Sequence, residues 1–279
     1  MMKIGIVILN YLAYQDTIEC VESILLQSFQ NFEVVVVENG SDNDSLLRLQ
    51  ERFGNDNKIS ILSTGKNIGF AKGNNAGIAF LKEKGIYKVL VINGDTVIEQ
   101  TDYLKQLQQI KYDETVGMVG TRIISKDKFN QNTTRVIFKN AFDVTFFNLY
   151  KILSLFRKKQ QADSQSIETT HLLDLSERQL HGAAILFTEN YLYQYIGFYP
   201  DTFLYVEEDL LAAICRKLSF KQLYISELSI YHKEDKSSDM AWSRSERHAV
   251  KRKFINESLK ELKKVYQMSS DELKAVMKG

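Results

Sequence analysis

The sequence predicts an α/β fold in which a mostly parallel sheet is covered by helices on both faces and is followed by a C-terminal helical extension. Short β-branched runs alternate with amphipathic stretches up to residue 123, a spacing typical of strand–helix–strand units. This alternation implies a mostly parallel sheet that is covered on both sides. Residues 245–278 are highly charged and lack any strand pattern.

Five segments are predicted as strands of this sheet: 3–9, 32–38, 58–63, 87–92 and 116–123. Each contains β-branched residues, which favour strands. Ligands of such sheets bind at the carboxyl ends of the strands, so we expect the chemistry at the residues that follow each strand.

The first predicted helix places Ile18, Val21 and Leu25 on one face. Asp16, followed three residues later by Glu19, resembles a capping box at its start.

A second helix is predicted from about Gly69, with Phe70, Asn74, Gly77 and Leu81 along one face. Glycines and asparagines weaken this helix, so a compensating contact is expected. The free N–H groups at its start are a ready anion site.

The alternation fails over residues 125–177, which we interpret as a variable insertion. The later elements are predicted as a strand at 180–187, a short helix from Glu189, a loop at 197–205, a helix at 208–218, a strand at 221–225, and two helices in 245–278, the second with a Ser269/Glu272 capping box. We therefore expect a main domain at 1–233 and a helical extension at 234–279.

Composition restricts the partners and compartments to be expected. The 279 residues are 44% hydrophobic, enough for a full core, and 36 basic against 35 acidic residues give a net charge of +1. No nucleic-acid partner is expected from this balance. Cys20 and Cys215 are predicted as buried helix positions, which suits a reducing compartment. The N-terminal apolar run is too short for a signal peptide or a membrane span, so a cytoplasmic protein is expected.

Polar residues follow the predicted strands where a ligand would bind. Asp95, directly after a buried strand, suits a hard cation that itself holds phosphate oxygens. A capping role for Asp95 is the alternative, and Glu38-Asn39-Gly40-Ser41 also has the composition of a simple turn.

Together these segments resemble the inverting family 2 glycosyltransferases of the GT-A fold, particularly the rhamnosyltransferase-like branch. The resemblance runs from Lys3 to about Lys233 and matches 125–177 poorly. It is carried by Ile6-Val7-Ile8-Leu9-Asn10-Tyr11, Val36-Val37-Glu38-Asn39-Gly40-Ser41, Asn67-Ile68-Gly69-Phe70-Ala71-Lys72-Gly73-Asn74-Asn75, Asn93-Gly94-Asp95 and Ile230-Tyr231-His232-Lys233.

The resemblance implies a nucleotide-sugar site and a metal site. Glu38 stands where the family has an acid that contacts the nucleobase and ribose. Asp95 and His232 would hold Mn²⁺ or Mg²⁺, although Asn93 replaces the first acid of the family's metal motif. The implied nucleotide-sugar-binding residues are Asn10, Tyr11, Glu38, Asn67, Gly69, Phe70, Asn74, Asn75, Asn93 and Gly94.

The stretch from Gly197 to Asp209 resembles the family's loop and helix start that carry the general base. We predict Glu208 as the base with Asp209 second, while Glu207 orients the acceptor or caps the helix. From the residues alone, three acids at a helix start only complement its dipole. The other histidines are predicted as structural or exposed, with His181 beside a small-residue stretch at the acceptor site; they are His171, His181 and His248.

The implied activity is inverting transfer of one sugar from a UDP- or dTDP-sugar to a hydroxyl of a lipid-linked glycan acceptor, in cell-surface or capsular polysaccharide synthesis. A dinucleotide-dependent oxidoreductase is excluded because residues 10–14 contain no glycine. A non-catalytic carbohydrate- or nucleotide-sugar-binding protein is the alternative, supported by Asn93 alone.

An aromatic stripe in the insertion suggests a membrane contact. Phe142, Phe146, Leu149, Leu153 and Phe156 recur at helical spacing before a basic run at 157–159. One hypothesis is a peripheral helix that touches a partner or the inner face of the cell membrane. The commoner alternative is ordinary packing against the core or a second subunit.

Overall fold

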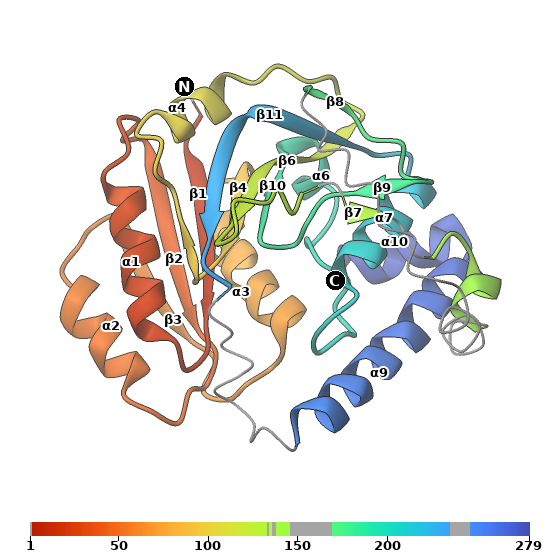
Figure 1. Cartoon of the computed structure of the whole chain (residues 1–279), viewed down its shortest axis with the longest axis horizontal. Coiled ribbons are helices and arrows are strands. Elements are labelled where there is room, and N and C mark those ends of the chain that lie inside the picture. The colour runs from red at the N-terminus through yellow and green to blue at the C-terminus, as the bar shows by residue number, and fades with distance from the viewer. Residues whose placement is uncertain (1, 133, 136–137, 146–168, 235–245) are drawn as a thin grey trace.

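The computed structural model describes residues 2–132, 134–135, 138–145, 169–234 and 246–279 (Figure 1). Its main sheet has the order β3-β2-β1-β4-β10-β6-β11-β5, with β8 pairing beside β11. The strands are β1 Ile4–Asn10, β2 Phe32–Glu38, β3 Ile59–Ser63, β4 Val89–Asn93, β5 Thr96–Val97, β6 Val116–Ser125, β8 His171–Leu172, β10 Ala184–Phe187 and β11 Lys221–His232. A separate pair joins β7 Thr134–Arg135 to β9 Arg178–Gln179.

The predicted mostly parallel sheet is confirmed. β1 pairs in parallel with β2 on one side and with β4 on the other, and β3 continues the parallel set beyond β2. β10 runs antiparallel between β4 and β6. The carboxyl ends of β1, β2 and β4 therefore meet at one edge of the sheet.

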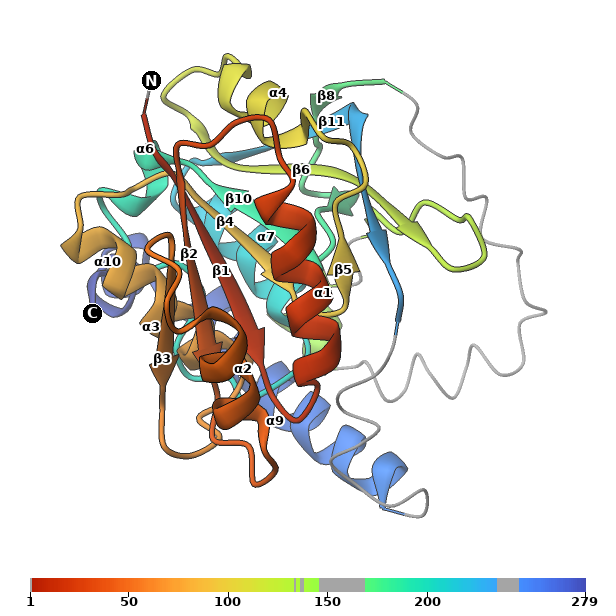
Figure 2. The same cartoon turned by 90° about the vertical axis from the view of Figure 1, so that its left-hand side faces the viewer.

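Helices cover both faces of the sheet (Figures 1 and 2). Side chains of the first group pack in one core layer; this group is α1 Tyr14–Leu25, α2 Ser45–Phe53 and α4 Tyr103–Gln109. The second group packs in the opposite layer and comprises α3 Phe70–Glu83, α6 Glu189–Leu192, α7 Glu207–Lys217, α9 Arg247–Gln267 and α10 Ser270–Lys278. Ile6 and Ile8 of β1 face the first layer, whereas Val7 faces the second, as strand alternation requires.

The glycines of α3 let this helix approach β1 closely. A Cβ on Gly73 would lie 2.5 Å from Leu9 Cδ1, and a Cβ on Gly77 would lie 2.6 Å from Val7 Cγ1. The contact that compensates for their weak helix propensity is thus packing against the sheet.

Several predicted local details differ from the structure. The capping box at Asp16 is wrong: Ala13 precedes α1 without a side-chain cap, and Asp16 and Glu19 instead bind the ammonium group of Lys233. The strand predicted at 180–187 is shorter, because a turn at residues 182–183 precedes β10. β11 continues seven residues beyond the predicted 221–225, through a register shift between Ile225 and Ser229.

The C-terminal helices are present as predicted. The Ser269/Glu272 capping box is confirmed, since Ser269 Oγ accepts from the Glu272 N–H at 3.2 Å and the Ser269 N–H donates to Glu272 at 2.7 Å. Leu262 and Leu273 are fully buried in the same core layer as Val7. The extension therefore shares the core of the sheet domain.

The aromatic stripe at 142–156 lies mostly outside the described residues. Of its described part, Phe142 is 60% exposed and Val144 is buried. Among the described helices, none has both the length and the apolar character needed to cross a bilayer.

Candidate active site

A cavity of about 680 Å³ opens at the carboxyl ends of β1 and β4. Its volume is typical of sites for small organic ligands. It is lined by Leu9, Tyr11, Ala13, Thr17, Asn39, Asn67, Gly69, Phe70, Asn93, Gly94, Asp95, Gln131, His181, Gly182, Ala183, Phe203, Leu204, Tyr205, Val206, Glu207, Glu208, His232, Glu234 and Lys251.

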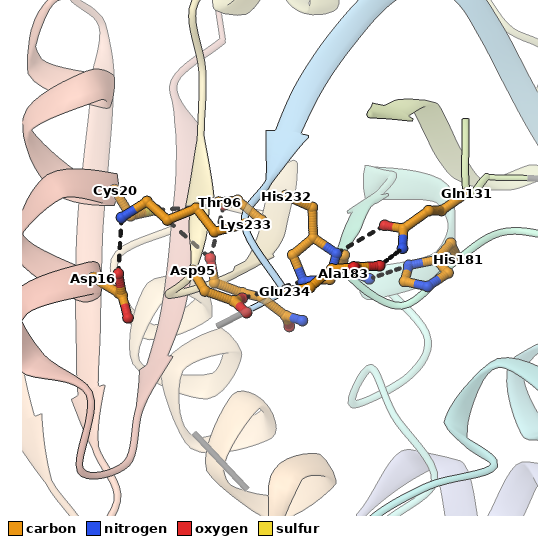
Figure 3. Close-up of polar contacts among 11 residues, drawn as sticks. Asp16, Cys20, Asp95, Thr96, Gln131, His181, Ala183, His232, Lys233 and Glu234 are labelled. Atoms are coloured by element: carbon orange, nitrogen blue, oxygen red, sulfur yellow. Dashed lines mark hydrogen bonds and ion pairs between the residues drawn. The ribbon is translucent and has the colours of Figure 1, made fainter. Parts of the chain in front are cut away.

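Asp95 and His232 face each other in this cavity (Figure 3). His232 Nε2 lies 3.3 Å from Asp95 Oδ1, and both side chains are mostly buried. Strand pairing brings them together: Thr96 of β5 pairs with His232 of β11, and the Lys233 N–H donates to the Asp95 carbonyl at 3.0 Å. The structure thus joins two residues that are 137 positions apart in the sequence.

The turn that carries Asp95 is supported by α1 and β5. Thr96 Oγ1 donates to the Asn93 carbonyl at 2.7 Å, and Cys20 Sγ lies 3.7 Å from the same carbonyl. A Cβ on Gly94 would approach Thr17 Oγ1 to 2.6 Å, so a larger residue in the middle of the turn would displace the Thr17 side chain. Burial raises the pKa of Cys20 to about 12, which makes it a packing thiol rather than a nucleophile.

An unusual backbone turn presents the acids of α7 to the cavity. Tyr205 and Val206 have φ values of 73° and 72°, a left-handed conformation that costs about 1–3 kcal/mol at each non-glycine residue. Glu207 and Glu208 follow directly and both line the cavity, whereas Asp209 is buried and does not.

The Glu208 carboxylate is positioned by the turn before β10. Its Oε1 accepts from the Gly182 N–H at 3.1 Å, and a Cβ on Gly182 would lie 2.8 Å from that oxygen. The backbone N–H of Gly182 therefore orients the Glu208 carboxylate, and this hydrogen bond involves no other side chain.

The neighbouring Glu207 keeps its proton more strongly than an ordinary glutamate. Burial, followed by the negative charge of Glu208, raises the pKa of Glu207 to about 8. At neutral pH Glu207 is therefore mostly protonated. A protonated carboxyl group beside a charged one is typical of sites that handle protons.

His181 also lines the cavity. Its Nδ1 accepts from the Ala183 N–H at 3.1 Å, and its ring lies 5.9 Å from the ring of His232. Burial is the main cause that lowers the pKa of His181, so it is neutral at physiological pH.

The nucleotide-binding end predicted for the cavity is built by backbone and amide groups. Asn39 donates to Asn67 Oδ1 at 3.1 Å and accepts from the Ile68 N–H at 3.1 Å, which fixes the loop before α3. The Phe70 N–H at the start of α3 donates to the Phe203 carbonyl at 2.7 Å. This first donor of the expected anion site is therefore already used.

Ten of the predicted site residues line the cavity, and five do not. Those that do are Tyr11, Asn67, Gly69, Phe70, Asn93, Gly94, Asp95, Glu207, Glu208 and His232. Those that do not are Asn10, Glu38, Asn74, Asn75 and Asp209.

The side chains outside the cavity are engaged in structural contacts. The Glu38 carboxylate accepts from the N–H groups of Gly40 and Ser41, at 3.3 and 2.8 Å. Asn75 makes two hydrogen bonds of 2.8 Å with the backbone of Phe198, which tie α3 to the loop after α6.

Two further amides outside the cavity serve local structure. Asn10 accepts from Thr17 Oγ1 at 3.0 Å, and Asn74 donates to the Phe70 carbonyl at 3.0 Å. Asn10 therefore ties the end of β1 to α1, and Asn74 bonds within α3.

The sequence did not predict Gln131, Glu234 or Lys251 at the site, and it pointed to His181 only through the small-residue stretch that follows it. Gln131 lies in the segment interpreted as an insertion, and Lys251 belongs to the C-terminal extension. Lys251 Nζ lies 5.3 Å from the ring centroid of Tyr205, which places an ammonium group at the cavity wall. Side chains of this kind, on polar segments, do not contribute to the hydrophobic periodicity of a helix or strand. That periodicity therefore could not predict that they line the cavity.

The donor set fits a divalent cation that is shared with a phosphate ligand. Across the described part of the chain, no group of three or more His, Cys, Asp or Glu is arranged to hold a metal. Asp95 and His232 supply two ligands, and Mg²⁺-type sites commonly take the remainder from substrate phosphates and water. The lining also carries more carboxyl groups than ammonium groups, so an anionic ligand needs a compensating cation.

The fold has solved structural neighbours. The chain superposes on Staphylococcus aureus TarS 1–349 in complex with UDP-GlcNAc with a TM-score of 0.58, at 17% identity, covering 92% of this chain and 66% of that one. It also superposes on the mannosyltransferase PcManGT from Pyrobaculum calidifontis, in complex with GDP-Man and Mn²⁺, with a TM-score of 0.55, at 16% identity, covering 88% and 60%. The GT-A-type fold is therefore confirmed.

Sequence relatives match less than half of the chain. The dTDP-rhamnosyl transferase RfbF of Shigella flexneri is 30% identical over 99 residues, covering 36% of this chain and 32% of that protein. Glycosyltransferase GlyG of Streptococcus pneumoniae serotype 4 (strain ATCC BAA-334 / TIGR4) is 27% identical over 117 residues, covering 42% and 38%. The bifunctional glycosyltransferase pgtA of Dictyostelium discoideum is 28% identical over 125 residues, covering 44% and 16%. These matches thus span well under half of each relative.

The sequence model of one family matches more than half of the chain. It is described as Glycosyl transferase family 2 and aligns with residues 5–172. This range contains β4, Asp95, Gln131 and nearly all of β1, and so includes the carboxyl edge on which the cavity is built. The chain belongs to glycosyl transferase family 2.

Proposed function

We propose that this protein is a metal-dependent, inverting glycosyltransferase that moves a sugar from a UDP- or dTDP-sugar to a hydroxyl of a glycan acceptor. The observation that carries the proposal is the arrangement of one cavity. The Asp95–His232 pair and Glu208 converge on it at the carboxyl edge of the sheet.

Asp95 and His232 would hold Mn²⁺ or Mg²⁺, which neutralises negative charge on the departing nucleoside diphosphate. Glu208 would take the proton from the acceptor hydroxyl as its oxygen attacks the anomeric carbon. The protonated Glu207 would donate a hydrogen bond to the sugar or the acceptor. A single displacement inverts the anomeric configuration and requires no sugar–enzyme bond.

The nucleoside is assigned to the part of the cavity lined by Tyr11, Asn39, Asn67 and Phe70. The aromatic rings can stack on a base and the side-chain amides can hydrogen-bond to it, which suits a pyrimidine. The relative RfbF, described as a dTDP-rhamnosyl transferase, supports a rhamnosyltransferase-like donor preference. A lipid-linked acceptor in surface polysaccharide synthesis, approached at the inner face of the membrane, completes the proposal.

The test combines binding with turnover. A thermal-shift panel of UDP, dTDP and GDP with their sugars, with and without Mn²⁺, should give the largest stabilisation with a pyrimidine nucleotide in the presence of metal. The best donor should then be hydrolysed slowly and transferred faster once a suitable glycan is added. Tighter binding of GDP than of UDP and dTDP would refute the pyrimidine assignment. Binding without any hydrolysis or transfer would favour the non-catalytic alternative.

A further inference from the structure

The two ring nitrogens of His232 have different partners. Nε2 lies 3.3 Å from Asp95 Oδ1, whereas Nδ1 lies 2.9 Å from Gln131 Oε1 (Figure 3). Gln131 comes from the segment after β6 and reaches His232 across 101 positions of sequence.

The orientation of the Gln131 amide is determined by its second partner. Gln131 Nε2 donates to Glu234 Oε1. A carboxylate only accepts hydrogen bonds, so the NH₂ group of Gln131 must face Glu234 and its oxygen must face His232. An amide oxygen also only accepts, and the hydrogen between Gln131 and His232 must therefore reside on His232 Nδ1.

We propose that Gln131 is a positioning residue that holds His232 in the Nδ1–H tautomer and so directs the Nε2 lone pair toward Asp95. This inference rests on the proposed function, because the proposed metal ion is the cation that the lone pair would bind. A lone pair and a carboxylate oxygen at 3.3 Å repel each other unless a cation lies between them. The chain from Glu234 through Gln131 to His232 is thus an outer shell of the kind that orients metal-ligating histidines.

His181, which lines the same cavity, has the opposite tautomer. Its Nδ1 accepts from the Ala183 backbone N–H, which is always a donor, so the hydrogen of neutral His181 is on Nε2. The two rings, 5.9 Å apart, therefore present a lone pair and an N–H group. His232 is equipped to bind a cation, and His181 to donate to an oxygen of the sugar, the phosphate or the acceptor.

The first test reads the tautomers directly, without metal or turnover. The chain has four histidines, so two-bond ¹H–¹⁵N spectra of the ¹⁵N-labelled, metal-free protein at about pH 8 are simple to assign with His232→Gln and His181→Gln variants. We expect a protonated Nδ1 in His232 and a protonated Nε2 in His181. An unprotonated Nδ1 in His232 would overturn the inference.

The second test measures the affinity for Mn²⁺ by electron paramagnetic resonance in the presence of UDP. Gln131→Leu should weaken Mn²⁺ binding about 10- to 100-fold, the usual effect of losing such a partner. The matched control is Gln109→Leu, an exposed glutamine on α4, which should bind Mn²⁺ like the wild type. Wild-type affinity in folded Gln131→Leu would overturn the inference.

Exchanging the amide of residue 131 with the carboxylate of residue 234 distinguishes a loss of His232 positioning from general structural damage. Gln131→Glu alone places two carboxylates side by side and should weaken Mn²⁺ binding. Adding Glu234→Gln restores a donor to residue 131, where the introduced carboxylate still accepts from His232 Nδ1–H, so affinity should return to within about threefold of wild type. No recovery in the folded double variant would count against the proposal. If wild-type protein binds no Mn²⁺ with UDP, the proposed function fails as well, whereas normal binding with the wrong tautomer refutes only the present inference.

Discussion

Replacing Glu208 with glutamine removes proton acceptance and leaves the shape of the site unchanged. In the structure Glu208 Oε1 accepts from the Gly182 N–H at 3.1 Å. The amide oxygen of the introduced glutamine would accept the same bond, so only the group facing the acceptor changes, from a carboxylate oxygen to an NH₂ group.

The expected loss follows from this single change. A positioned general base contributes about 10²–10⁴ in rate, which corresponds to about 3–5 kcal/mol of activation free energy. The free energy of unfolding should change by less than about 1 kcal/mol, because the hydrogen bond from Gly182 is retained. The pKa of Glu207 should fall, since the charge of Glu208 contributes to its elevation.

The assay compares Glu208→Gln with Asp209→Asn under saturating donor, normalised to folded protein. Asp209 is the matched control because it is the next acid of α7 and does not line the cavity. Turnover should be lost in Glu208→Gln while the Kd for UDP with Mn²⁺ stays near that of the wild type, and folded Asp209→Asn should remain active. Near wild-type turnover in Glu208→Gln, with loss in Asp209→Asn, would refute the assignment.

The same geometry supports three further predictions. Asp95→Ala should lower transfer about 100-fold or more, as loss of a main charge-stabilising group does, and full activity in excess chelator would contradict the metal site. Glu207 keeps its proton in the folded state up to about pH 8, against an ordinary pKa of 4.5, so its contribution to stability is complete below about pH 4.5 and is lost as pH rises through 8. The free energy of unfolding of the metal-free wild type should therefore fall across this window by on the order of 5 kcal/mol, seen as a falling Tm. Glu207→Gln should abolish that fall, and parallel Tm curves would refute the assignment. Gly77→Ala places a Cβ 2.6 Å from Val7 Cγ1, and overpacking of about 1–3 kcal/mol should outweigh the helix preference for alanine of about 1 kcal/mol; urea denaturation that shows a more stable variant would refute the close approach.

Local patterns in the chain were sufficient to predict the α/β layering and the edge that carries the site. The strand predicted at 32–38 coincides with β2, and the capping box at Ser269 has the expected reciprocal hydrogen bonds. Both features depend on residues close together in the chain, through alternation or through a three-residue spacing. The position of Asp95 at the carboxyl edge also follows, because a parallel sheet places every such strand end on one side.

Long-range partners emerged only with the folded chain. Asp16 and Glu19 have the spacing of a capping box, yet they bind Lys233, 217 and 214 positions away. The negative charge of these side chains is satisfied equally well by a helix terminus or by an ammonium group, and local spacing does not distinguish the two.

The same limit explains the residues of the site that the sequence did not predict. Gln131 contacts His232 only because β11 runs parallel to β6 and ends beside the segment that follows it. An amide side chain has no hydrophobic period, and its hydrogen bonds are directional over only a few ångströms. Its partner is therefore fixed by the register of two strands far apart in the chain, and that register exists only once the sheet has formed.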